Sequence, residues 1–168
     1  MWHKTGNWAI GGLQEIGFNS NSDLLMVLSS QGRGIFDCVK NEKIGRDYFD
    51  YYMENWDSDL GIVEGFGILK DEKIKCGGFE APDILKKETK DGWKIKIEKA
   101  IRPNWKKEDV MSNVLYLTNK EINEKIEIYY FHSEIDRGYG YSETGNSFVI
   151  GTSSNLLIWN RKIILVDN

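Results

Sequence analysis

LLMVLSS, residues 24–30, is the stretch from which the fold is predicted. The apolar run has the length of a strand, and its lack of alternation predicts burial on both faces. A turn of Asn, Ser and Asp residues precedes it at 19–23, and the glycine turn QGRG at 31–34 leads into IFDCV at 35–39. Because these residues favour tight connections, the segment predicts neighbouring strands joined by short turns.

The same order of elements returns near the carboxyl end of the chain. At a constant shift of 123 positions, GYSE at 140–143 leads into FVIGTSS at 148–154 and then LIWN at 157–160. Serine pairs at 29–30 and 153–154 follow the two apolar runs and predict turns that hydrogen-bond to their own backbone. A repeated strand–turn–strand unit predicts a fold assembled from related modules.

This order of strands and turns resembles one blade of a β-propeller of the tryptophan–aspartate repeat type. Phe36-Asp37 and Trp159-Asn160 stand where that family has Trp-Asp, while the Gly-His half of its signature is absent. The shift of 123 equals three intervals of 41, and such blades run roughly 40–45 residues. The resemblance covers the two ends of the chain and implies sheets of four strands. The chain also resembles uncharacterised bacterial proteins that share its Gly-Arg-Gly and Ser-Ser-x-Leu-x-Ile-Trp stretches.

We therefore expect one mainly β domain over residues 1–168, with antiparallel sheets built from related four-stranded units. Small propeller-like, sandwich and barrel arrangements all fit the repeat. One or two short helices are expected, the clearer one from Ala81 to Thr89, where Pro82 suits an early helical position. The apolar run at 163–166 predicts a closing strand that pairs with the N-terminal region and covers sheet edges.

Composition narrows the classes of function. A net charge of −4 and a pI near 5.3 disfavour a general nucleic-acid binder, although the Lys-rich stretch 83–107 leaves base stacking by Trp93 and Trp105 as a lesser alternative. The first residues lack the pattern of a signal peptide, and no apolar run reaches the roughly 18 residues of a membrane helix. We expect a cytoplasmic protein with no membrane partner.

Residues suited to catalysis or metal binding are few. Cys38 and Cys76 are the only cysteines, and we expect both as reduced, buried thiols. His3 and His132 supply further ligand types for zinc, but no close-spaced ligand pair supports such a site. The sequence therefore predicts no catalytic residue, no metal site and no cofactor.

The most distinctive segment runs from Asp47 to Glu64. It carries six carboxylates without a single Lys or Arg, interleaved with Tyr, Phe and Trp. Carboxylates grouped in this way gain from a cationic partner, and Tyr and Trp are over-represented at binding hot spots. The alternative is a solvated acidic loop whose aromatic side chains anchor it to the core. We predict a partner-binding surface made of Asp47, Asp50, Tyr51, Tyr52, Glu54, Trp56, Asp57 and Asp59.

The expected function is that of a non-catalytic domain that binds another protein with a basic surface. One concrete form is an immunity protein that neutralises a toxin. The first alternative is a small hydrolase that uses Asp37, Asp47 and Arg33 on a nucleotide-like or other small substrate. The second is a propeller-like scaffold module in a larger complex. A pocket with clustered carboxylates favours the hydrolase, and a flat acidic face favours the binder.

Overall fold

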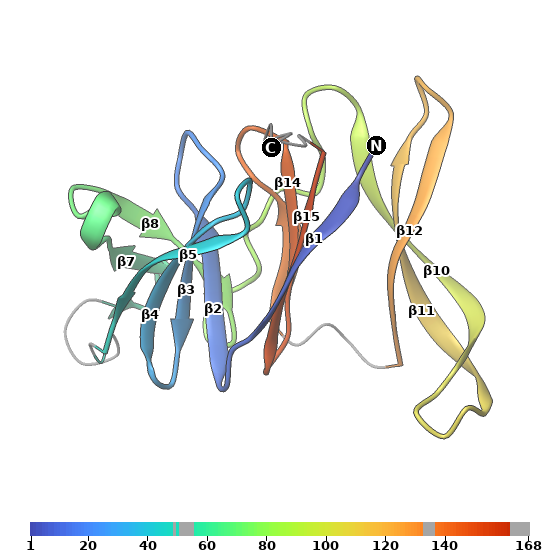
Figure 1. Cartoon of the computed structure of the whole chain (residues 1–168), viewed down its shortest axis with the longest axis horizontal. Coiled ribbons are helices and arrows are strands. Elements are labelled where there is room, and N and C mark those ends of the chain that lie inside the picture. The colour runs from blue at the N-terminus through green and yellow to red at the C-terminus, as the bar shows by residue number, and fades with distance from the viewer. Residues whose placement is uncertain (49, 51–55, 133–136, 162–168) are drawn as a thin grey trace, which may run out of the picture. The chain divides into compact units, whose positions relative to one another are not determined.

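Figure 1 shows a computed structural model of the chain, which describes residues 1–48, 50, 56–132 and 137–161. The fold is mainly β, as the sequence predicts, with four antiparallel sheets of three to five strands. Two compact units make up the chain: a larger one, Met1–Lys86 with Asp136–Asn168, and a smaller one, Lys87–Ile135. The single-domain organisation expected from the sequence stays a prediction.

The first repeated module is a four-stranded antiparallel meander in the larger unit. Its strands are β2 (Leu13–Phe18), β3 (Leu24–Ser29), β4 (Gly32–Asp37) and β5 (Glu42–Asp47), with the short β9 (Gly77–Gly78) beyond β2. Leu25 and Val27 of β3 pack into one core cluster, whereas Met26 and Leu28 pack into another. Strand β3 is therefore buried on both faces, as its unbroken apolar run predicts.

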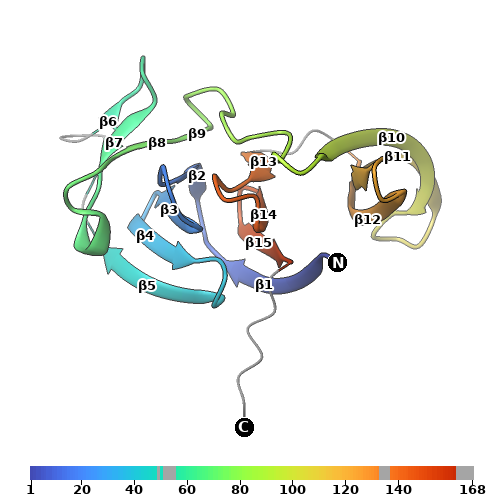
Figure 2. The same cartoon turned by 90° about the horizontal axis from the view of Figure 1, so that it is seen from above.

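The second module is the counterpart of the first. Its sheet runs in the order β13 (Gly138–Tyr141), β14 (Ser147–Gly151), β15 (Asn155–Asn160) and β1 (His3–Ala9). Figure 2 shows the two modules side by side, one running from β2 to β5 and the other from β13 to β1. The N-terminal strand thus completes a module whose other strands lie near the carboxyl end of the chain.

The two modules share one pairing register. Leu25 of β3 pairs with Phe36 of β4. At the same shift of 123 positions, Phe148 of β14 pairs with Trp159 of β15. The pairs that join β2 to β3 and β13 to β14 keep this shift as well. The repeat in the sequence is therefore a repeat of strand pairing.

Strand β1 is also the sequence counterpart of β5. Both contain Lys-x-Gly: Lys43 pairs with Phe36, and Lys4 pairs with Trp159. A bulge follows each lysine, so that Gly45 and Gly6 return to the ladder at equivalent places. Each lysine ammonium also lies over its aromatic partner, at 5.7 Å from the ring centre of Phe36 and 5.5 Å from that of Trp159. The two modules thus share their edge strand as well.

Among the described residues of the larger unit, buried apolar side chains form two hydrophobic clusters. The first joins the two modules and includes Ile16, Phe36, Val149 and Ile158, all at most 1% exposed. The second joins the other face of the first module to a small sheet of β6 (Trp56–Asp57), β7 (Ile62–Glu64) and β8 (Lys73–Lys75). The first module therefore lies between two partners, and burial of its apolar side chains on both faces stabilises it.

The smaller unit is one antiparallel sheet of β10 (Trp93–Pro103), β11 (Asp109–Asn119) and β12 (Glu124–Phe131). Its charged side chains form ion pairs within and between strands: Lys96 contacts Glu98 on the same strand, Lys125 of β12 also contacts Glu98, and Arg102 of β10 contacts Glu127 of β12. Since β10 and β12 are the two outer strands of this sheet, the pairs of Glu98 with Lys125 and of Arg102 with Glu127 connect them across β11.

The helix expected from Ala81 to Thr89 is not formed. Asp83 Oδ1 accepts a hydrogen bond from Leu85 N, and Lys86 O accepts one from Tyr141 N at the edge of β13. Pairing with a sheet edge satisfies backbone groups that a helix would otherwise pair, so the segment is not helical. Within the described residues, the helical content is a single 3-10 turn, η1 (Gly67–Leu69).

Three further expectations have different outcomes. The described strands form no closed barrel, which removes one of the three arrangements that fitted the repeat. The polar sequence of residues 104–113 predicts a loop or one helical turn, but the structure begins β11 at Asp109. The closing strand predicted at 163–166 lies outside the described residues, and the N-terminal strand pairs with β15.

Candidate functional site

Asp47, the first residue of the predicted binding surface, is held in an ion pair. Arg33 donates from Nε and Nη2 to the two carboxylate oxygens, at 3.2 and 2.5 Å, and from Nη1 to the backbone oxygen of Glu64 at 2.7 Å. The Arg33 guanidinium also lies 4.7 Å from the ring centre of Phe66. Arg33 is buried, so this pair serves to join β4, β5 and β7.

The remaining predicted residues divide into described and undescribed ones. Tyr51, Tyr52 and Glu54 lie outside the described residues, and Asp50 is exposed. Trp56 is half-buried against the second core cluster. These positions are neither confirmed nor excluded as a binding surface.

Trp56, Asp57 and Asp59 belong to the β6–β7 hairpin. Trp56 Nε1 donates to Glu80 Oε2 at 2.9 Å, which ties the hairpin to the loop after β9. Asp57 Oδ1 accepts from Leu60 N at 3.0 Å and closes the hairpin turn, while Asp59 is exposed. The Asp57 carboxylate thus stabilises the hairpin turn, and the Asp59 carboxylate is exposed at the surface.

Together the hairpin and the following loop present a mixed surface. Cys76 N donates to Gly61 O at 2.7 Å, so the hairpin turn lies against the residue that precedes β9, and the loop with Phe79 and Glu80 follows directly after β9. Two large apolar side chains stand exposed there, Leu60 at 59% and Phe79 at 60%, and the Arg137 guanidinium lies 4.7 Å from the ring centre of Phe79. We call this surface the acidic patch and define it by Asp57, Asp59, Leu60, Phe79 and Glu80.

A buried carboxylate supports the acidic patch from below. Glu15 of β2 is fully buried, and its Oε1 accepts a hydrogen bond from Glu80 N at 2.6 Å. Burial raises the pKa of the Glu15 carboxyl above its ordinary value, against the opposing effect of the backbone N–H of Glu80. The protonation state of Glu15 is therefore coupled to the loop that carries Phe79 and Glu80.

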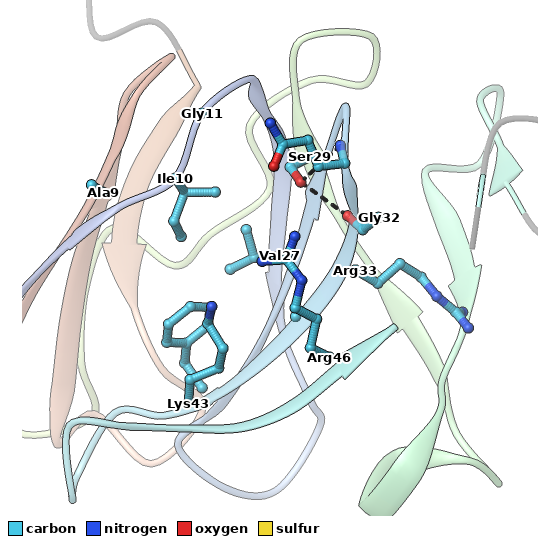
Figure 3. Close-up of a pocket in the computed structure, with 12 residues that line it drawn as sticks. Ala9, Ile10, Gly11, Val27, Ser29, Gly32, Arg33, Lys43 and Arg46 are labelled. Carbon is cyan, nitrogen blue, oxygen red and sulfur yellow. Dashed lines mark hydrogen bonds between the residues drawn. The ribbon is translucent and has the colours of Figure 1, made fainter. Parts of the chain in front are cut away.

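A second feature is a hollow of about 80 Å³ over the first module, between the β1–β2 turn and strands β3 to β5 (Figure 3). Buried Val27 and Phe36 form its floor, and Lys43 and Arg46 stand exposed at its side. Arg33 also lines the hollow but points away from it in Figure 3. None of its described lining residues is acidic.

A bulge brings the two cations to one face of the sheet. Arg46 pairs with Gly34 and Lys43 pairs with Phe36, with a register shift between these pairs. Simple alternation places positions 43 and 46 on opposite faces, and the extra residue Ile44 removes that difference. Because of this bulge, the alternation of side chains in the sequence does not predict that Lys43 and Arg46 lie on the same face. The Lys-x-Gly repeat in β1 and β5 is the signal that identifies the bulge.

The side chains considered for hydrolysis have structural partners. Asp37 Oδ1 accepts from Val39 N and Lys40 N and closes the β4–β5 turn. Arg33 and Asp47 bind each other, as described above. Among the described residues, no group of three or more His, Cys, Asp or Glu side chains could hold a metal ion. Asp37 and Asp47 thus have structural contacts, and the hydrolase alternative stays a prediction.

The thiols are buried as the sequence predicts, and the predicted turn contact forms at Ser29 but not at the second serine pair. Cys38 and Cys76 are both free and buried, and burial raises the pKa of each thiol above its ordinary value. Ser29 Oγ donates to Gly32 O at 3.1 Å and accepts from Gln31 N. Its counterpart is Thr152, not a member of the second serine pair, and Thr152 Oγ1 makes the equivalent contact with Asn155 O.

No protein-family model matches the chain, and no curated protein shows significant similarity to it. In the part of the chain that the structure describes, no helix has the length and apolar character needed to cross a membrane.

Proposed function

We propose that the protein is a non-catalytic domain that binds another protein through the acidic patch. The observation that supports this proposal is the exposure of Leu60 and Phe79 beside the carboxylates of Asp59 and Glu80. Apolar side chains at the surface supply contact area, and surrounding carboxylates favour a basic partner and disfavour an acidic one. The sequence from 47 to 64, which lacks Lys and Arg, leads directly into this patch.

One concrete form of this function is an immunity protein that acts in the cytoplasm on a basic toxin. Toxins that cleave nucleic acids hold phosphates with cationic surfaces, and an acidic patch competes for the same surface. The structural use of Asp37, Asp47 and Arg33 supports binding over hydrolysis.

The test is capture of partners with the whole protein from extracts of the cells that make it. The patch variant carries Asp57→Asn and Asp59→Lys. Asn keeps an oxygen for the Leu60 N–H, and Asp59 lies exposed, so both changes preserve the hairpin. A control variant, Asp71→Lys with Glu121→Gln, changes the net charge equally at exposed positions elsewhere.

The expected result is a basic protein that the wild type and the control retain and the patch variant loses. Its binding should weaken as salt rises, because exposed charge pairs are screened. Equal retention by all three proteins, or retention of acidic proteins only, contradicts the proposal. Circular dichroism of each variant establishes that loss of binding is not loss of fold.

A further inference from the structure

We propose that the hollow over the first module binds an oxyanion, namely a carboxylate or phosphate group. The site is separate from the acidic patch and does not depend on the function proposed for that patch. It consists of Lys43, Arg46 and the Gln31 side chain above a floor of Val27 and Phe36.

The first argument is uncompensated charge. Neither Lys43 nor Arg46 forms an ion pair with any described residue; their contacts there are with the rings of Phe36, at 5.7 Å, and Tyr48, at 4.8 Å. The nearby Arg33 differs, because Asp47 neutralises it. In a protein whose net charge is −4, two cations that share a concave surface with no acidic lining attract an anion.

The second argument comes from the other module. Gly34 and Arg46 form the cross-strand pair beside Val27, and the equivalent pair in the second module is Leu157 with Asn7. The second module thus keeps the same strand register with a large apolar residue and a neutral one. The fold of a module does not require the glycine–arginine pair, so this pair is a specific property of the first module.

The third argument is size and lining. A volume of about 80 Å³ exceeds the roughly 10–15 Å³ that one water needs, and suits a group of a few heavy atoms. The apolar floor lowers the local dielectric and strengthens attraction between the cations and an anion. The amide of Gln31 adds a neutral donor. A planar or tetrahedral oxyanion meets all of these features.

The test is a ¹H–¹⁵N NMR titration of the whole protein at low ionic strength. Inorganic phosphate and N-acetyl-glutamate are the two probes, with sodium chloride at matched ionic strength as the reference. We expect saturable shifts centred on the amides of Gly11, Gly34 and Arg46 with at least one probe. Tighter binding of phosphate indicates a free phosphate ligand, and tighter binding of N-acetyl-glutamate indicates the carboxylate of an acidic side chain.

Matched variants assign the shifts to the hollow. Lys43→Gln with Arg46→Asn, the latter taken from Asn7, should weaken binding about tenfold. Lys4→Gln with Lys75→Gln removes the same charge elsewhere and should titrate like the wild type. Arg46→Asn alone serves if the double variant does not fold. Shifts that do not saturate, that chloride reproduces, or that survive removal of both cations overturn the proposal.

Discussion

The Ser142 hydroxyl donates a hydrogen bond to Asp23 Oδ1 at 2.6 Å, and both side chains are buried. The Thr144 hydroxyl donates to the other oxygen of the same carboxylate at 2.7 Å. Asp23 ends the β2–β3 turn, whereas Ser142 and Thr144 lie in the corresponding β13–β14 turn. One carboxylate therefore joins equivalent turns of the two modules, next to the apolar core that they share.

Replacement of Asp23 by Ala should destabilise the larger unit. The change removes two hydrogen bonds to a charged acceptor and leaves the Ser142 hydroxyl buried with fewer partners, so we expect a loss of roughly 2–4 kcal/mol in the free energy of unfolding. Asp23→Asn, which keeps one acceptor oxygen, should lose less. Urea unfolding followed by tryptophan fluorescence measures both variants. A loss below about 0.5 kcal/mol for the Ala variant contradicts a structural role of this contact.

The sequence predicts three strands of each module, but it does not predict that the N-terminal strand β1 forms the edge of the second module. The segment around Leu25 and the segment around Phe148 lie at one constant shift, so comparison of the chain with itself finds three strands of each module. The fourth strand of the second module lies at the N-terminus, where no constant shift reaches it. The failed helix from Ala81 to Thr89 has a related cause, because tertiary pairing of Lys86 with Tyr141 overrides local preference.

Replacement of Arg33 by Lys should destabilise the first module although the charge is kept. A lysine carries its three donors on one nitrogen and cannot reproduce the fork by which the guanidinium reaches both Asp47 oxygens and Glu64 O, and it loses the guanidinium contact with the Phe66 ring. We expect a loss of about 1–3 kcal/mol in the free energy of unfolding.

Arg46→Lys is the matched control for this change. It alters an exposed arginine on the neighbouring strand and should change stability by less than about 0.5 kcal/mol. Equal effects of the two substitutions in urea unfolding contradict the special role of Arg33.

The sequence predicts only part of the candidate site. Acidic residues from 47 to 59 stand out by composition, but composition does not show that Asp47 is paired with Arg33. Glu80 joins the acidic patch through Trp56, a contact between residues 24 positions apart that no local pattern encodes. Lys43 and Arg46 become neighbours on one face through a bulge, which alternation alone hides.

Glu15 should make the larger unit less stable as pH rises. Its folded pKa lies above the ordinary value of 4.5, so the folded protein binds a proton that the unfolded chain has already lost. The free energy of unfolding therefore falls as pH rises from 4.5 through the raised pKa. In the Glu15→Gln variant, the decrease in the free energy of unfolding over this pH range should be smaller. Urea midpoints over a pH series compare the two proteins, and identical pH profiles contradict the assignment.

The smaller unit should lose stability as pH falls, whereas the effect of Glu15 on the larger unit is a loss of stability as pH rises. Hydrogen bonds from Lys125 and Lys96 lower the pKa of Glu98, and a hydrogen bond from Arg102 lowers that of Glu127. Their contribution to stability is present above the ordinary value of 4.5 and is lost as pH falls through the lowered values. Amide hydrogen exchange of β10 to β12 should therefore quicken in acid, corrected for intrinsic rates. The double variant Glu98→Gln with Glu127→Gln should lack most of this acceleration.

Cys38 and Cys76 should report on opening of the larger unit. Both thiols are fully buried, and their raised pKa values keep them protonated near neutral pH, so iodoacetamide should label neither in the folded protein. Labelling then requires opening of the core, and its rate follows the population of open molecules when reclosing is fast. Asp23→Ala should accelerate labelling of Cys38, whose N–H donates to Asp23 O. Rapid labelling of the wild type by mass spectrometry, or no acceleration in a variant that urea shows to be destabilised, contradicts this link between the turn contact and the core.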